Sequence, residues 1–255
     1  MKSTTIHLAG SKQIFIGVMF GLALVLISSF VLKSQPLINL PDACEQVVMA
    51  YAKDWSSTTG TLLLLEKKEH QWDTVSAAIK VNFGKNGMRW GRGLHRNIKT
   101  LEKQEGDGCA PAGVFELGLA FGYDEQPTGL SWPYQRVTDR DYFVDDANSG
   151  DYNTWQKIPV NEVNDPKLKW NSYEHMKRKD HLYSLGIVVK HNESPIVKGK
   201  GSAIFLHVER APGSPTLGCT SMKAADLLKI MRWLDVHKQP LLIQAPKKEL
   251  NNIEM

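Results

Sequence analysis

The feature that most restricts this chain is an uncharged run near its amino terminus. No charged residue occurs from Ile14 to Leu32, whereas Lys2 and Lys12 precede the run and Lys33 follows it. A helix of about 19 residues just spans the hydrocarbon core of a bilayer. A cleaved secretory signal is the alternative, although its apolar core is usually shorter and no A-x-A cleavage site follows. Either alternative exports the rest of the chain and leaves the basic front on the inner side of the membrane.

The remainder is long enough for one folded domain. We predict a cytoplasmic tip with a signal anchor or signal peptide at 1–35, a linker containing two prolines at 36–41, a domain at 42–250 and a tail at 251–255. A domain of about 200 residues buries a core without needing disulfides or metals. Hydrophobic residues make up 42% and charged residues 23% of the chain, so its composition is that of a globular protein and not of a disordered one.

The charge pattern argues against a nucleic-acid partner. The net charge is +4, but the basic residues form only short clusters, such as 177–179 and 198–200, among scattered acids. A mildly basic surface suits an anionic polymer, although net charge alone does not choose between partners. His175, His181 and His191 lack the paired spacing of a zinc site, so we expect neither a metal nor a cofactor.

The chain has three cysteines, an odd number in a compartment where disulfides persist. Cys44 and Cys109 could pair, which would leave Cys219 free. Disulfide formation depends on geometry that a sequence does not contain, so both states of the first two thiols stay open.

The domain is predicted to be built mostly of strands. Apolar runs and alternating patterns predict strands at 61–66, 77–83, 114–117, 182–190, 202–208 and 240–244. One helix is predicted at 224–234, because apolar residues recur there at helical spacing. The segment 106–118 is dense in Gly and Pro and predicts a shaped loop that leads into a short strand. The aromatic-rich segment 123–176 has no sustained period and predicts long loops.

The strongest chemical signal is the stretch FLHVERAPGSPTLGCTSM at 205–222. His207 ends a predicted strand, and Cys219 follows a Gly- and Pro-rich loop just before Thr220 or Ser221, either of which could cap the next helix. A helix N-terminus and a nearby imidazole would lower the pKa of the thiol. We therefore predict Cys219 as a nucleophile and His207 as its base, with the backbone amides around Gly218 and Cys219 facing an oxyanion. A buried thiol and an ordinary histidine are the alternative, because Cys is often buried.

These motifs resemble the active-site signature of the L,D-transpeptidase (YkuD-like) family. PTLGCTSM, preceded by IFLHV, is similar to the family's His followed by Ser/Thr-x-Gly-Cys, and GDGCAPAGVFELG is similar to its Gly-rich segment. The resemblance implies a mainly β fold: a β-sandwich-like catalytic domain with a few helices, here preceded by one transmembrane or signal helix. It also implies an enzyme that forms a cysteinyl thioester with a peptidoglycan stem peptide, releases D-alanine, and transfers the acyl group to an amine. Such chemistry cross-links and remodels the cell wall and bears on cell shape.

The resemblance carries roles onto particular residues. Cys219 is expected to be the nucleophile and His207 the base, while Thr216, Leu217 and Gly218 are expected to shape the active-site loop and oxyanion hole. Leu217 stands where many members have His, and Thr220-Ser221 stands where a hydrophobic residue followed by Arg or Asn is usual. Arg92, Arg210 and Ser202 are therefore candidates for contacting the substrate, and a backbone carbonyl is a candidate for orienting His207.

Two other functions fit the same pattern. An L,D-carboxypeptidase or amidase would give the acyl group to water, and a non-catalytic module would only bind the wall. The expected partners are peptidoglycan stem peptides and, through the N-terminal segment, the membrane. Nothing in the sequence indicates an oligomeric state.

Overall fold

The computed structural model describes residues 38–69 and 71–255. The predicted membrane segment at 14–32 lies outside these residues. Among the residues described, no helix combines the length and apolar character needed to cross a bilayer. The described part is mainly β, as the sequence predicts, and contains one α-helix, α1 (Ala224–Trp233).

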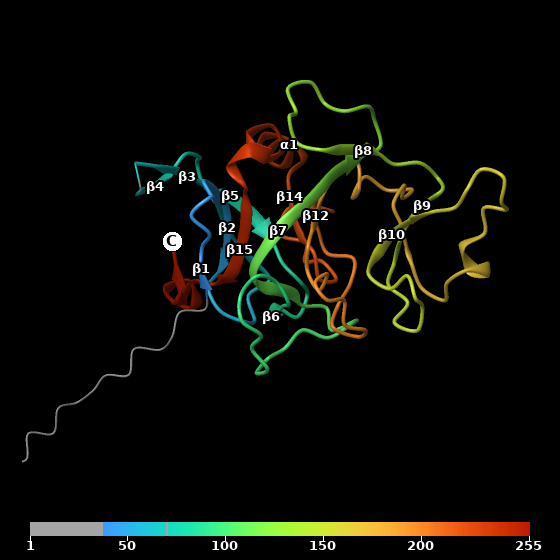
Figure 1. The fold of residues 1–255 in the computed structure, drawn as a ribbon, viewed down its shortest axis with the longest axis horizontal. Coiled ribbons are helices and arrows are strands. Elements are labelled where there is room, and N and C mark those ends of the chain that lie inside the picture. The colour runs from blue at the N-terminus through green and yellow to red at the C-terminus, as the bar shows by residue number, and fades with distance from the viewer. Residues whose placement is uncertain (1–37, 70) are drawn as a thin grey trace, which may run out of the picture. The chain divides into compact units, whose positions relative to one another are not determined.

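Most strands belong to one large sheet (Figure 1). Its principal strands are β2 (Gln46–Ala52), β3 (Thr59–Lys68), β5 (Ile79–Asn82), β7 (Ala110–Gly122), β12 (Leu185–Val189), β13 (Phe205–Val208), β14 (Thr220–Met222) and β15 (Leu241–Pro246). Three further strands join its borders, namely β4 (Gln71–Thr74), β6 (Met88–Trp90) and β8 (Tyr134–Arg136).

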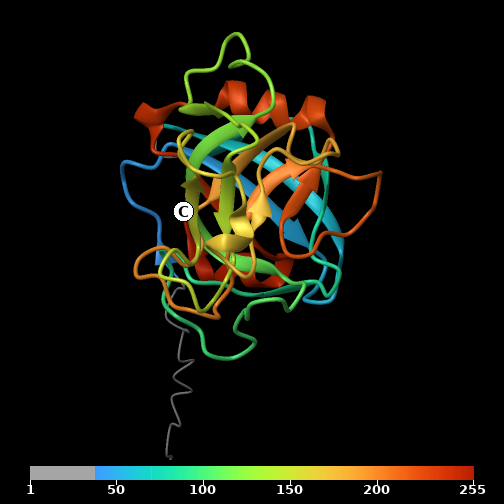
Figure 2. The same cartoon turned by 90° about the vertical axis from the view of Figure 1, so that its right-hand side faces the viewer.

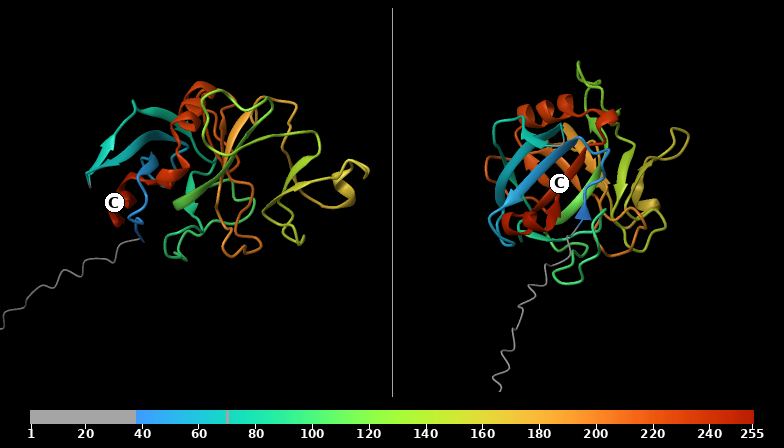
Figure 3. Two further views of the ribbon diagram at one scale, coloured as in Figure 1. Left: turned by 45° about the horizontal axis from the view of Figure 1, so that its top comes forward. Right: turned by 60° about the vertical axis from the view of Figure 1, so that its left-hand side comes forward.

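The principal strands close into a ring. Their order is β12-β13-β14-β5-β3-β2-β15-β7, and β7 pairs in turn with β12. The closure depends on the length of β7, since Gly113–Glu116 pair with β15 while Leu117–Gly122 pair with β12. The expected sandwich-like pair of sheets is thus joined into one continuous sheet, whose strands wrap around the core in Figure 3.

The helix α1 covers one end of this sheet, above the strands in the view of Figure 2. Leu227, Ile230 and Met231 are buried in the hydrophobic core, as the helical spacing of the sequence predicts. The strand β2 is missing from the predictions, although five of its seven residues are buried. Because both of its faces are covered, it lacks the alternation that marks a half-exposed strand.

Several predicted boundaries were wrong. The strand predicted at 114–117 extends from Ala110 to Gly122, so most of the Gly-rich segment at 106–118 is sheet. The strand predicted at 202–208 begins only at Phe205. The predicted long loops at 123–176 contain a small sheet of β9 (Asp141–Val144), β10 (Thr154–Lys157) and β11 (Glu174–His175). All four residues of β9 are buried, so this strand also shows no alternation.

The predicted linker and tail meet in the structure. Ile38 and Asn39 form β1 and pair in parallel with Ile253 and Glu254 of β16. This pairing joins residues that are far apart in the sequence, and neither short segment contains a pattern that predicts it. The two segments therefore form a two-stranded sheet.

The cysteines are all free thiols, and all three are buried. The Sγ of Cys44 lies 3.4 Å from the carbonyl oxygen of Gln46, and the Sγ of Cys109 lies 3.3 Å from that of Asn86. The structure thus holds no bridge between Cys44 and Cys109.

Candidate active site

Cys219 and His207 line the same cavity, which has a volume of about 440 Å³. The strands β13 and β14 run in parallel, with His207 beside Ser221. Cys219 directly precedes β14 at the end of the loop, and its side chain lines the cavity together with those of His207 and Ser221. The predicted pair is therefore brought together by the register of two neighbouring strands, across the loop at 209–219.

The thiol of Cys219 is held by backbone groups. The N–H of Phe205 donates to its Sγ at 3.3 Å, and the Sγ lies 3.4 Å from the carbonyl oxygen of Ala203. Burial, which penalises the thiolate, raises the pKa of Cys219 to about 12, and the Phe205 N–H opposes this rise. No hydrogen bond among the described residues joins the thiol to His207, so a nucleophilic role for Cys219 would require the thiol hydrogen to turn from the Ala203 carbonyl toward the imidazole.

The predicted helix cap beside Cys219 was wrong. Thr220 and Ser221 belong to the strand β14, and α1 starts only at Ala224 after Lys223. Cys219 therefore does not sit at a helix N-terminus, and the helix dipole is not positioned to lower its pKa. This strand has only three residues, all buried, so its sequence pattern cannot be told from that of the first turn of a helix.

His207 has one ring nitrogen fixed by the backbone. Its Nδ1 lies 2.8 Å from the carbonyl oxygen of Val208. A carbonyl only accepts, so Nδ1 carries the hydrogen and Nε2 is left as an acceptor. Burial lowers the pKa of His207 to about 4, because the charged form is poorly solvated there. The imidazole is therefore neutral and has the tautomer that a general base requires.

The loop before Cys219 is tied together by one hydroxyl. The Oγ1 of Thr216 donates to the carbonyl oxygen of Cys219 at 2.6 Å and accepts from the N–H of Gly218 at 3.1 Å. Gly218 has a φ of +149°, and a Cβ there would lie 3.2 Å from the carbonyl oxygen of Cys109. Leu217 is 76% exposed at the cavity rim. The Gly218 N–H is thus already engaged, which leaves only the Cys219 amide of the two predicted for an oxyanion.

The three predicted substrate contacts are placed differently from one another. Arg210 lines the cavity, is 64% exposed, and lies 3.9 Å from Asp180. Ser202 also lines it, and its hydroxyl donates to Glu105 at 2.7 Å. Arg92 lines a different cavity, so the structure does not bring it to Cys219.

Several charged or polar residues of the cavity were not predicted, among them Glu174, Arg178, Tyr183 and Lys103. Arg178 pairs with Asp180 at 2.9 Å and with Glu174 at 3.3 Å, which lowers the pKa of Asp180 to about 2. The Tyr183 hydroxyl lies 3.3 Å from Glu174, and its ring packs edge-on against His207 with centroids 5.5 Å apart. Lys103 lies in the segment between β6 and β7. The sequence shows these residues only as parts of ordinary polar stretches.

A family model described as the L,D-transpeptidase catalytic domain (YkuD) matches residues 54–243, which include both His207 and Cys219. No curated protein sequence matches the chain.

Two solved structures are similar to the chain at 13% sequence identity and a TM-score of 0.38. They are Bd1075 from Bdellovibrio bacteriovorus and the helical cell shape determining protein Pgp2 from Campylobacter jejuni. Each alignment covers 82% of this chain, but only 51% of Bd1075 and 52% of Pgp2, so the chain matches about half the length of each.

Proposed function

The chain belongs to the L,D-transpeptidase (YkuD) catalytic domain family, whose members act on peptidoglycan stem peptides, and from this premise we propose that it joins stem peptides through a thioester on Cys219. The observation that carries the proposal is the pairing of a buried thiol with a neutral, backbone-oriented imidazole in one cavity. Nucleophile and base are the two groups that acyl transfer requires.

Acylation begins with the neutral pair. Nε2 of His207 takes the thiol proton as the Sγ of Cys219 bonds to the carbonyl carbon of the stem peptide, whose oxygen becomes an oxyanion. The intermediate collapses when the C–N bond to the terminal D-alanine breaks, and the imidazolium returns its proton to the leaving amine. A thioester and free D-alanine remain, and His207 is neutral again.

The second half reverses these roles on a new amine. The amine of a neighbouring stem attacks the thioester carbonyl while Nε2 accepts its proton, and the C–S bond then breaks. The proton returns to the sulfur, so the thiol is regenerated and one amide has replaced another. Arg210 and Ser202 are the proposed contacts for the stem peptide, because both line the cavity.

The proposed location follows from the substrate. Peptidoglycan lies outside the cytoplasmic membrane, so the catalytic domain at 42–250 must be exported. The basic front and uncharged run within residues 1–35 support an anchored or secreted protein, with the linker at 36–41 leading to the domain.

The test combines intact-protein and product mass spectrometry. The full-length protein in detergent is mixed with tetrapeptide muropeptides and compared with Cys219→Ala and with Cys44→Ala, a matched removal of another buried thiol. We expect a transient adduct on Cys219, free D-alanine and a cross-linked dimer in the wild type and Cys44→Ala, and none in Cys219→Ala.

Other products would replace the proposal. Shortened stems without a dimer would indicate a carboxypeptidase on the same residues, and freed fragments an amidase. Muropeptide binding that survives Cys219→Ala, with no turnover in the wild type, would indicate a wall-binding module.

A further inference from the structure

The cavity contains a buried cation that has no role in the proposed proton transfers between Cys219 and His207. The side chain of Lys103 is 4% exposed, and it lines the cavity together with Gly218 and Cys219. The residue lies in a polar segment that follows β6, more than a hundred positions before Cys219 in the sequence. Only the tertiary structure brings the two together.

The lysine is held in a slot between two glycines. A Cβ at Gly201 would lie 2.9 Å from the Cε of Lys103, and a Cβ at Gly218 would lie 3.6 Å from its Nζ. Both glycines have positive φ, +96° and +149°, where side chains are disfavoured. The missing side chains therefore leave room for the lysine stem and let its ammonium approach the backbone that precedes Cys219.

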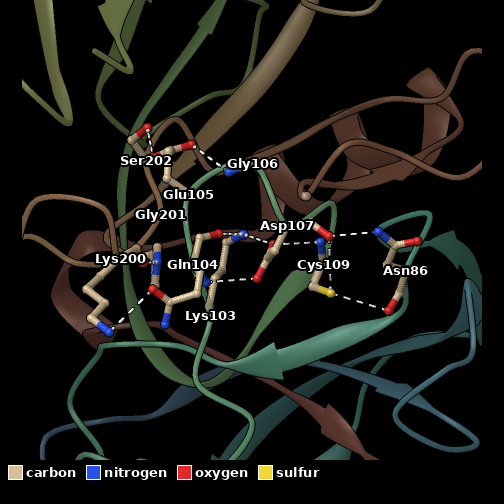
Figure 4. Close-up of polar contacts among 12 residues, drawn as sticks. Asn86, Lys103, Gln104, Glu105, Gly106, Asp107, Cys109, Lys200, Gly201 and Ser202 are labelled. Carbon is tan, nitrogen blue, oxygen red and sulfur yellow. Dashed lines mark hydrogen bonds and ion pairs between the residues drawn. The ribbon is translucent and has the colours of Figure 1, made fainter. Parts of the chain in front are cut away.

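The loop of Lys103 is fixed by one carboxylate (Figure 4). The Nζ of Lys103 lies 2.8 Å from Oδ1 of Asp107, which also accepts from the N–H of Cys109 at 2.9 Å, while Oδ2 accepts from the N–H of Gln104 at 2.8 Å. The Nζ also lies 3.5 Å from the carbonyl oxygen of Gln104. An ammonium has three N–H donors. Among the described residues two of them are thus used, and the third is available to an acceptor in the cavity.

The site lacks one oxyanion donor that it would otherwise have. The N–H of Gly218 is bonded to Thr216, so it does not face the cavity as a free donor. Of the other cations that line the cavity, Arg178 is paired with two carboxylates and Arg210 is 64% exposed. Lys103 has a single carboxylate partner and lies next to Gly218. From this geometry we propose that the ammonium of Lys103 stabilises the negative charge that develops on the thiolate and on the substrate carbonyl oxygen when Cys219 attacks.

The charges around Cys219 agree with this assignment. Lys103 and Arg178 lower the pKa of the Cys219 thiol, whereas Glu174 raises it. The other titratable or charged side chains that line the cavity are Glu105, Asp145, His207 and Arg210. Lys103 itself faces Asp107 and also the imidazole of His191, whose pKa burial and the nearby ammonium lower to about 3. Removal of Lys103 would thus leave the thiol side of the cavity with less positive charge. The proposal rests on Cys219 being the nucleophile.

The test compares two alkylating reagents on the thiolate. Iodoacetate carries a carboxylate and iodoacetamide is neutral, so the ratio of their rates at Cys219 reports the local charge and cancels the fraction of thiolate. The rates are measured on full-length protein by site-resolved mass spectrometry at one pH and low ionic strength, because salt screens charges. We expect Lys103→Met to lower the ratio about three- to tenfold, because a nearby cation attracts the anionic reagent, and to lower kcat/KM for acylation about 10- to 100-fold.

Matched variants separate charge from structure. Lys103→Arg keeps the cation and should retain the wild-type ratio within about twofold. Lys200→Met removes a neighbouring ammonium that pairs with Glu102 and does not line the cavity, and it should leave the ratio unchanged. Asp107→Asn removes the compensating negative charge and should raise the ratio.

An unchanged ratio in Lys103→Met, with Cys219 reactive in the wild type, would overturn the role of Lys103 while leaving the proposed nucleophile in place. A ratio that falls equally in Lys103→Met and Lys103→Arg would mean a packing role, which also overturns it. If the wild-type protein formed neither an adduct on Cys219 nor free D-alanine with tetrapeptide muropeptides, the proposed function itself would fail, which is a separate outcome from a failure of Lys103.

Discussion

The neutral state of His207 makes a prediction about stability in acid. The side chain is 6% exposed, and burial lowers its pKa from 6.5 to about 4. In the unfolded chain the same imidazole titrates near 6.5. Between about pH 4 and 6.5 the unfolded state therefore binds more protons than the folded state. The free energy of unfolding must rise with pH through this window, with the contribution of His207 fully present above pH 6.5 and lost on acidification.

The size of the effect follows from the two pKa values. A difference of one pKa unit corresponds to about 1.4 kcal/mol, so His207 costs the folded state about 2 kcal/mol at pH 5 relative to pH 7. His191, whose pKa is lowered to about 3, adds to the same slope in the wild type. Substitution of His207 alone isolates its contribution to the pH dependence of stability, because every other group titrates in both the wild type and the variant.

The assay is urea unfolding at pH 7 and pH 5. In His207→Gln the amide can still donate to the carbonyl oxygen of Val208, but it does not titrate. We expect the loss of unfolding free energy between the two pH values to be about 2 kcal/mol smaller in the variant than in the wild type. His181→Gln, a substitution at an exposed histidine, is the control. Equal losses in His207→Gln and the wild type would refute the neutral buried imidazole, and with it the base assigned to the reaction.

Three further predictions concern the active-site loop and the reacting pair. The proposed base His207 must be unprotonated, and its pKa is about 4, while the pKa of Cys219 is about 12. In stopped-assay kinetics kcat/KM should therefore fall below about pH 5 and stay flat to about pH 9. A bell-shaped profile centred near neutrality would instead indicate a preformed thiolate–imidazolium pair. Thr216→Val removes the hydroxyl that joins the Gly218 N–H to the Cys219 carbonyl, and should cost about 1–2 kcal/mol in chemical unfolding, with Thr216→Ser retaining most of the stability. Gly218→Ala places a Cβ at a φ of +149° and 3.2 Å from the Cys109 carbonyl oxygen. The variant should lower the rate of acyl transfer at least about tenfold and the free energy of unfolding by about 1–3 kcal/mol. Wild-type turnover in this variant would contradict the strained geometry.

Sequence patterns were most informative where one residue type dictates the chemistry. The motif around His207 and Cys219 predicted the family, which the match over 54–243 confirms, and the roles proposed for the two residues come from it. The helix at α1 was also predicted, because its buried face repeats at a fixed helical spacing. Such signals are local, so they survive without knowledge of the fold.

Tertiary structure decided the surroundings of the pair. The carbonyl of Val208 that fixes the imidazole carries no side-chain signal. The segment Thr220–Met222 is a strand and not the expected helix cap, because it pairs with β13 and β5. Lys103 reaches the cavity only because Gly201 and Gly218, distant in sequence, leave room for its stem. Residue types thus determined which groups could react. Burial and long-range packing determined their protonation, orientation and charged neighbours, because these depend on distances that the order of residues does not contain.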